Sequence, residues 1–309
     1  MNLTARLKRM LAVSLLLAAP GVGAQEGEGD VIYVPTPQEV VDEMLNMAKV
    51  GPSDYIIDLG SGDGRIVITA ATKHGARGFG VDLDRVLLKR ANENARLAGV
   101  ADRAHFLEQD LFQTDLTPAT VITAYLLPEL NLKLRPKILG LKPGTRVVTH
   151  DYDMAEWFPD AQKIMPVPGK EVGDEDKSYI FLYTVPAKMA GRWLSQIEHG
   201  RKVVPYDFFF DQDFQFVEGM VRVGKREGKI PEFRLVGDQF EFNSQLIVEG
   251  RMLAHRFSGK VKNDTIEGTV TFGQGKAQRT RPWVARLIEA REVSYGGSHP
   301  ARRFQRMTQ

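Results

Sequence analysis

The 309-residue chain contains no cysteine. This absence excludes a disulfide framework, a thiolate zinc site and a cysteine nucleophile. Long apolar runs are missing after the first twenty residues, so no later segment is long enough to cross a bilayer as a helix. The six histidines show no metal-ligand spacing, and we predict no metal site. With 43% hydrophobic and 26% charged residues, the chain is expected to be globular and to form two domains.

A short apolar run lies near the N-terminus. Three basic residues precede the apolar residues 11–20, and small residues precede Gln25. This order is typical of a secretory signal peptide, whose apolar run is too short to span a bilayer. We therefore predict a cleaved signal peptide over residues 1–24 and an exported, periplasmic mature protein without a transmembrane segment. An uncleaved N-terminal anchor is the alternative.

Both halves of the chain contain acidic and basic residues, but in different proportions. Residues 25–186 carry 17 Lys and Arg against 25 Asp and Glu, whereas residues 187–309 carry 21 against 14. The basic half could meet an anionic partner, or the two halves could simply complement each other. We predict no nucleic-acid partner.

The first half alternates between strand and helix patterns. Thr36 is expected to cap the first helix, with Pro37 as its first residue and Glu39 completing a capping box. Further helices are predicted at 64–74, 84–98 and 129–139, and strands at 55–59, 78–82, 104–109, 121–125, 145–151, 163–167 and 179–185. The last two strands are expected to pair antiparallel. This alternation predicts an α/β domain over residues 25–186, with a mostly parallel sheet between helices.

The second half has a different period. Short aromatic and β-branched runs separated by glycine turns predict a small all-β domain, a barrel or sandwich, over residues 187–292, with strands about six residues long. Trp193 near its start and Trp283 near its end are expected to help to close it. The basic tail 293–309 has no periodicity and is expected to be flexible.

The segment IIDLGSGDGRIV (residues 56–67) predicts a strand followed by a glycine-rich turn that lets a ligand touch the backbone. A dinucleotide fingerprint would place its third glycine at position 65, which is arginine, so the spacing disfavours NAD. The segment also lacks the Gly-Lys-Ser/Thr ending of a nucleotide-triphosphate loop. The remaining pattern, Asp58 followed by Gly60, Gly62 and Gly64, resembles the cofactor loop of class I S-adenosylmethionine-dependent methyltransferases.

That resemblance implies a Rossmann-like seven-stranded sheet and a set of cofactor contacts. Gly60, Ser61, Gly62 and Gly64 would form the loop, with Asp58 near the ammonium group of the methionine portion. Asp82, at the end of the second strand and followed by Leu83, would accept both ribose hydroxyls. Asp110, after the third strand, would accept from the adenine amino group, with Leu111 beside it. Ligands bind at the carboxyl ends of strands in such sheets.

A closer resemblance rests on YVPTP (residues 33–37) and DLGSGDGRIVITAA (residues 58–71). These segments resemble the mitochondrial protein-lysine N-methyltransferases that act on the ATP synthase c subunit and the adenine nucleotide translocase. The resemblance covers residues 31–151 and would place Tyr33 and Thr36 over the cofactor. The segment TAYLLPELN departs from the family's substrate-facing pattern, which leaves the acceptor open.

Tyr125 and Glu129 follow the fourth strand, where class I enzymes meet their acceptors, and we consider them substrate-pocket candidates. No general base stands out. The favoured hypothesis is an exported S-adenosyl-L-methionine-dependent methyltransferase that acts on protein lysine, with a β domain that recruits the substrate. The alternatives are a non-catalytic module that binds the cofactor and a partner, and a small-molecule methyltransferase.

Overall fold

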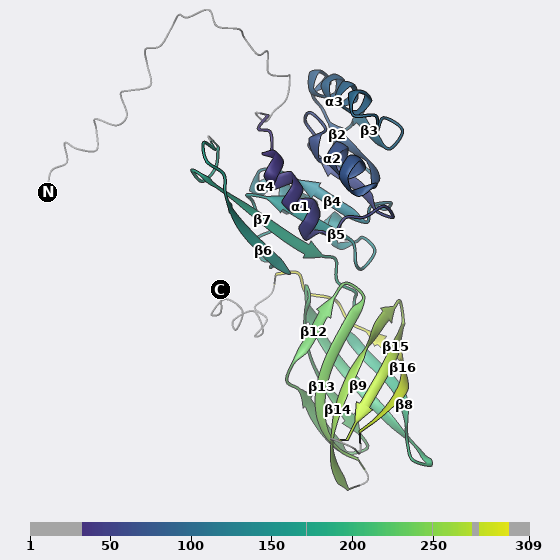
Figure 1. Cartoon of the computed structure of the whole chain (residues 1–309). Coiled ribbons are helices and arrows are strands. Elements are labelled where there is room, and N and C mark those ends of the chain that lie inside the picture. The colour runs from purple at the N-terminus through teal and green to yellow at the C-terminus, as the bar shows by residue number, and fades with distance from the viewer. Residues whose placement is uncertain (1–32, 171, 249, 274–277, 297–309) are drawn as a thin grey trace, which may run out of the picture.

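The computed structural model describes residues 33–170, 172–248, 250–273 and 278–296. The predicted signal peptide therefore lies outside the described residues. Two β-sheets follow one another along the chain, and the second extends away from the first (Figure 1). The first sheet carries helices, whereas the second consists of strands and turns alone.

The first sheet has seven strands in the order β3-β2-β1-β4-β5-β7-β6. The first five strands in the chain pair parallel, while β7 pairs antiparallel with both β5 and β6. Their bounds are β1 Tyr55–Leu59, β2 Arg77–Asp82, β3 Ala104–Glu108, β4 Val121–Ala124, β5 Arg146–His150, β6 Ala161–Pro166 and β7 Lys177–Thr184. The predicted parallel sheet and its closing antiparallel pair are confirmed.

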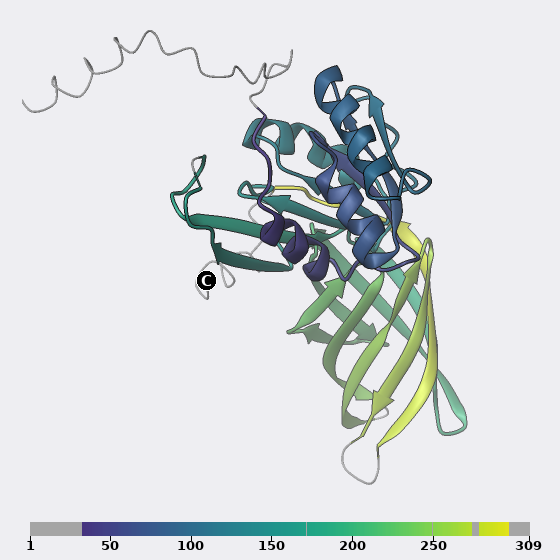
Figure 2. The same cartoon turned by 45° about the horizontal axis from the view of Figure 1, so that its top comes forward.

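Helices cover both faces of this sheet (Figure 2). They are α1 Gln38–Met47, α2 Arg65–His74, α3 Arg85–Leu97 and α4 Pro128–Leu139. Successive strand residues point to opposite faces, so Ile56 packs in the cluster that contains α1 and α2, whereas Ile57 packs in the cluster that contains α4. This alternation explains why both residues are fully buried in one strand.

The start of α1 differs from the prediction. The N-cap is Pro37, and no side chain caps the helix. Thr36 Oγ1 instead lies 3.2 Å from Nδ1 of His150, a residue 114 positions away in the sequence. The predicted capping box is wrong because this tertiary hydrogen bond takes the Thr36 hydroxyl away from the helix end.

The second sheet has nine antiparallel strands in the order β11-β10-β9-β8-β16-β15-β14-β13-β12. Their bounds are β8 Gly191–His199, β9 Lys202–Asp213, β10 Phe216–Val223, β11 Arg226–Ile230, β12 Phe233–Val236, β13 Gln239–Val248, β14 Arg251–Lys262, β15 Thr265–Phe272 and β16 Arg279–Ala290. The expected strand length of about six residues is wrong, since β9, β14 and β16 each have 12 residues.

This sheet curls around an aromatic core and is nearly closed. Trp193 and Trp283 are fully buried in it together with Phe208, Phe242 and Phe257. The first and last strands, β8 and β16, pair directly, as the positions of the two tryptophans suggested. At the other side, the Ser244 hydroxyl of β13, the strand next to the edge strand β12, donates to the Lys229 carbonyl of the opposite edge strand β11 over 3.1 Å.

One turn of the second sheet enters the first. Phe214, between β9 and β10, is fully buried in the core of the seven-stranded sheet, where its ring stacks on Trp157 with 6.3 Å between centroids. The backbone N–H of Phe214 donates to Ser294, and Tyr295 packs edge-on against the Phe214 ring. Residues 293–296 therefore have defined contacts with the turn at Phe214, while residues 297–309 lie outside the described part, and the flexibility of the tail stays a prediction.

In the part of the chain that the structure describes, no helix is both long enough and apolar enough to cross a membrane.

Candidate functional site

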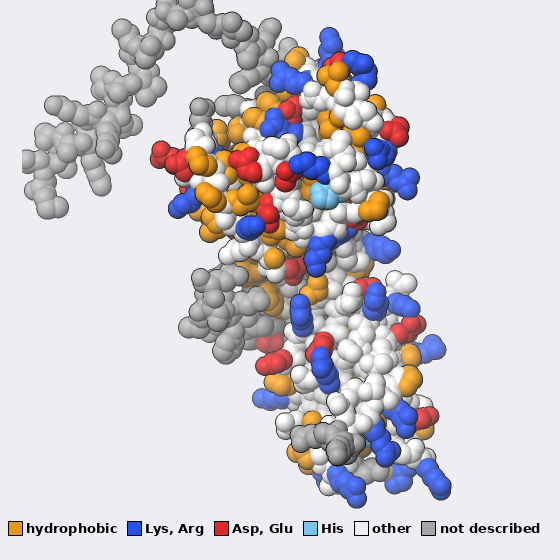
Figure 3. Space-filling model, viewed as in Figure 1, with side chains coloured by type: hydrophobic (Ala, Val, Ile, Leu, Met, Phe, Trp, Pro, Cys, Tyr) orange, Lys and Arg blue, Asp and Glu red, His pale blue; other side chains and the backbone are white. Residues whose placement is uncertain are grey.

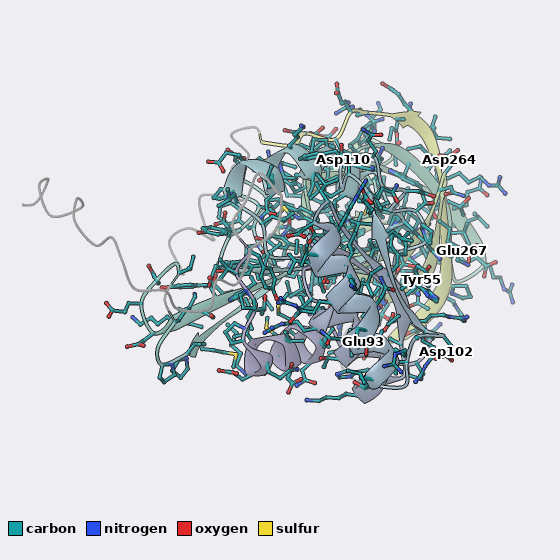
Figure 4. All side chains as sticks on the ribbon, turned by 90° about the horizontal axis from the view of Figure 1, so that it is seen from above. Tyr55, Glu93, Asp102, Asp110, Asp264 and Glu267 are labelled. Carbon is teal, nitrogen blue, oxygen red and sulfur yellow. The ribbon has the colours of Figure 1, made fainter. Side chains whose placement is uncertain are left out.

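A cavity of about 460 Å³ lies at the carboxyl ends of β1, β2, β3 and β4. Ten of the predicted site residues line it: Tyr33, Thr36, Asp58, Gly60, Ser61, Asp82, Leu83, Asp110, Leu111 and Tyr125. Tyr55, where β1 begins, stands apart from Asp110 in Figure 4. The strand directions thus bring together residues that are up to 92 positions apart in the sequence.

The glycine-rich turn between β1 and α2 forms the floor of the cavity. The Gly60 and Ser61 amides both donate to the Val81 carbonyl over 3.0 Å, which fastens the turn to β2. Gly62 has a φ of +53°, and a Cβ there would lie 2.4 Å from the Tyr33 ring. Only glycine therefore lets Tyr33 lie over the turn.

Gly62 and Gly64 are adjacent to the cavity but do not line it. The Gly62 amide donates to Oδ2 of Asp82 over 2.9 Å. Gly64 precedes α2 with a φ of +81°, and a Cβ there would lie 2.5 Å from the Phe106 ring. The third glycine thus allows close packing of α2 on β3.

Each of the three predicted acids has a protein partner. Asp82 accepts from the Gly62 and Asp84 amides, and Asp110 accepts from the Phe112 amide over 2.8 Å. Asp58 accepts from the Thr123 hydroxyl over 2.6 Å. These bonds fix the carboxylates at the cavity wall, and each carboxylate retains lone pairs for a ligand.

Asp58 is the most buried of the three acids, with 2% of its surface exposed. Burial raises the pKa of its carboxyl from the usual value near 4 to about 7, and the negative charges of Asp82 and Asp63 add to the rise. A cation in the cavity would favour the ionised form of this group.

Asp63 and Arg65 are cavity residues that sequence reasoning missed. Arg65 forms a two-pronged ion pair with Asp63, and its Nη1 donates to the Thr36 carbonyl over 2.7 Å, which holds the segment before α1 over the cavity. An arginine in the first turn of a helix is unfavourable beside the helix dipole unless it has a partner. The position of Arg65 in the first turn of a predicted helix was therefore the feature of the sequence that could have indicated its role.

The two substrate-pocket candidates are placed differently. Tyr125 lines the cavity, while Glu129, in the first turn of α4, is exposed and does not. The Tyr125 hydroxyl donates to Asp151 over 3.0 Å, and its ring lies 4.0 Å from the His150 ring. Burial and the Asp151 charge raise the pKa of the Tyr125 hydroxyl, which keeps it a hydrogen-bond donor.

Behind Tyr125 lies a buried network that the sequence did not indicate. Lys170, on the loop between β6 and β7, forms an ion pair with Asp151 at 2.6 Å, and both side chains are almost fully buried. His150 lies between Thr36 and Ser178, and burial lowers the pKa of its imidazole to about 4, so the ring is neutral at pH 7. The network joins the segment before α1, β5 and the β6–β7 hairpin.

Residues 58–161 match the family described as the ANTKMT methyltransferase domain. A protein-lysine N-methyltransferase from Saccharolobus islandicus (strain REY15A) is 44% identical over 131 residues, which are 42% of this chain and 81% of that protein. The chain belongs to the ANTKMT methyltransferase family. As a member, it is an S-adenosyl-L-methionine-dependent methyltransferase.

Other relatives of this ANTKMT family domain match similar portions of the chain. The Mus musculus lysine N-methyltransferase of the ATP synthase c subunit is 32% identical over 131 residues, and the chain spans 51% of its length. A crystal structure described as an RNA methyltransferase from Salinibacter ruber in complex with S-adenosyl-L-homocysteine has 48% identity and a TM-score of 0.46. The match covers 50% of this chain and 96% of the chain in that crystal structure.

The cavity of the ANTKMT family domain fits the charge of S-adenosyl-L-methionine. The cofactor carries a sulfonium, an ammonium and a carboxylate group, so its net charge is positive, and the cavity has an excess of acids over its single arginine. Its acids are Asp58, Asp63, Asp82, Asp84 and Asp110. The buried Ser61 hydroxyl has no hydrogen-bond partner among the described residues and could serve a ligand. We propose that Asp82 holds the ribose and Asp110 the adenine, as the resemblance implied.

Replacement of Asp82 by alanine should lower the affinity for S-adenosyl-L-homocysteine about a hundredfold in isothermal titration, because hydrogen bonds to a charged group contribute about 1.5–3 kcal/mol each. Asp82→Asn, which keeps an acceptor for the Gly62 amide, separates loosening of the turn from loss of the ligand contact. Asp102→Ala, at an exposed turn before β3, is the matched control. Equal affinities of Asp82→Ala and the control would contradict the assignment.

Asp58 should make the stability of the ligand-free protein depend on pH. Its pKa of about 7 in the folded state lies above the unfolded value, so its contribution to stability is full below about pH 4 and is lost as the pH rises through 7. Between pH 5 and 8, the wild type should lose about 2–3 kcal/mol of unfolding free energy relative to Asp58→Asn. Urea unfolding of both proteins measures this, and parallel pH profiles would show that the carboxyl titrates normally.

Proposed function

We propose that the protein is a protein-lysine N-methyltransferase that is exported and acts in the periplasm, and that its nine-stranded sheet recruits the protein substrate. The observation that carries the proposal is one acidic cavity with an aromatic side chain on each of two segments, Tyr33 before α1 and Tyr125 after β4. The names of the archaeal and mouse relatives support lysine as the acceptor.

When bound, the cofactor supplies a methyl group on a sulfonium, which is an excellent leaving group. The protein must therefore align the acceptor amine with the methyl group and remove water from it. Tyr33 and Tyr125 can contact the ammonium form of lysine through their ring faces. A pocket that is partly desolvated also lowers the pKa of the ammonium group, which favours the neutral amine that attacks.

Tyr125 is held in place for this role. Its hydroxyl donates to Oδ2 of Asp151, and Lys170 Nζ forms an ion pair with the same carboxylate, contacting both of its oxygens. The backbone amide of Tyr179 donates to the same Asp151 carboxylate over 3.1 Å. Three segments thus fix one aromatic ring at the cavity wall, and preorganisation of this kind reduces the entropy lost on binding an acceptor.

Export rests on the sequence of residues 1–24, with its basic start, short apolar run and small residues before Gln25. Mass spectrometry of the protein isolated from cells that carry the gene should find Gln25 as the predominant N-terminus. Peptides that retain residues before Gln25 on most molecules would contradict cleavage.

The acceptor is tested by incubating the protein that begins at Gln25 with radiolabelled methyl donor and a bacterial envelope extract. Label should survive acid hydrolysis as methyl-lysine, and Tyr125→Phe should lower its rate of formation about tenfold, the cost of one hydrogen bond in positioning. Asp82→Ala provides the inactive control. Label that ribonuclease removes would contradict the protein acceptor, and a complete lack of label would favour a binding module without turnover.

A further inference from the structure

The nine-stranded sheet has two ends with different surroundings. The turns at Phe214 and Gly237 lie against the seven-stranded sheet, since Phe214 is buried in its core and Gly237 contacts Gly144. Because all neighbouring strands pair antiparallel, the alternate turns lie at the opposite end. We call that opposite end the distal end. It comprises the described residues of four turns, 199–202, 223–226, 248 with 250–251, and 272–273 with 278–279, which lie farthest from the helices in Figures 1 and 2.

Cations concentrate at the distal end, as the lower part of Figure 3 shows. Every one of the four turns contributes at least one exposed Lys or Arg. The described ones are Arg201, Lys202, Lys225, Arg226, Arg251, Arg279 and Arg281, against the acids Glu198 and Glu227. Leaving Lys202 aside, none of these cations has an ion-pair partner within the residues that the structure describes. The described residues of the distal end therefore carry a strong excess of positive charge.

The end beside the helices has the opposite character. Acids outnumber bases in its turns, including Asp264 and Glu267, which Figure 4 labels. Two of the cations there are paired, Lys262 with Glu267 and Arg291 with Asp211. Charge is thus sorted along the strands, so a general excess of surface lysine and arginine does not explain the distal cluster.

Two aliphatic side chains project beside the cations of the distal end. Met252 follows Arg251 and is 62% exposed, and Val203 follows Lys202 and is 56% exposed. Both lie next to turns, where a flat surface could reach them. Projecting aliphatic groups flanked by Lys and Arg combine an apolar insertion with attraction to anionic headgroups.

We infer that the distal end is a docking surface for a bilayer that contains anionic phospholipids. The unpaired cations match the headgroup charge, and Met252 and Val203 supply the apolar contact. A single-stranded nucleic acid would instead be expected to need exposed aromatic rings for stacking, and the exposed apolar side chains of the distal turns are aliphatic. The surface is separate from the cofactor cavity, so the inference does not rest on the proposed function.

The test uses the protein that begins at Gln25, so that every described residue is kept. The apolar residues 11–20 are omitted because they could bind lipid themselves. In flotation assays it should bind vesicles of phosphatidylcholine with about 30% phosphatidylglycerol, and bind pure phosphatidylcholine vesicles at least about tenfold more weakly. Raising the salt from about 0.1 to about 0.5 M should release it. The triple variant Arg201→Glu, Lys225→Glu, Arg251→Glu should lower the partition coefficient about a hundredfold.

A matched triple, Lys89→Glu, Arg90→Glu and Arg286→Glu, changes the net charge equally but leaves the distal end intact. It should keep most of the binding. Met252→Ser, which changes no charge, should weaken binding about tenfold without altering its salt dependence. Equal losses in the two triples, equal binding to neutral and anionic vesicles, or binding to single-stranded RNA but not to vesicles would overturn the inference. Melting temperatures within a few degrees of the wild type verify that the variants fold.

Discussion

The hydrogen bond from the Gly62 amide to the Asp82 carboxylate is the constraint on which the site depends. It ties the turn after β1 to the end of β2, and two further amides of that turn bond to the Val81 carbonyl. With the turn fixed, Tyr33 can lie over Gly62, and Arg65 at the start of α2 can reach the Thr36 carbonyl. The floor and the cover of the cavity therefore derive from one short segment whose conformation β2 determines.

The sequence predicted most of this arrangement because its signals are local. Apolar runs that end in acids gave the strands and the positions of Asp58, Asp82 and Asp110, and the parallel sheet then brought these side chains to one edge. The capping role of Thr36 was wrong because its partner, His150, is distant in sequence. Lys170 and Asp151 could not be paired in advance for the same reason, since neither position has a local pattern.

The second sheet was less predictable than the first. Alternating aromatic residues indicated strands, but the glycines within them were interpreted as turns. The predicted strands were therefore shorter than the strands in the structure. Gly259 and Gly268 instead face each other within the paired strands β14 and β15, and a Cβ at either position would collide with backbone atoms of the neighbouring strand. Glycine here permits close strand contact in a tightly curled sheet, and local sequence does not distinguish this role from a turn.

The length of the second sheet has a geometric consequence. β9 runs for 12 residues without interruption, or about 40 Å at the usual rise of a strand, and the burial of Phe214 anchors it in the core of the first sheet. The nine-stranded sheet therefore holds the distal end away from the seven-stranded sheet that carries the cavity. While the distal end rests on a surface, an acceptor that reaches the cavity must project from that surface, so its height, as well as its local sequence, would select it.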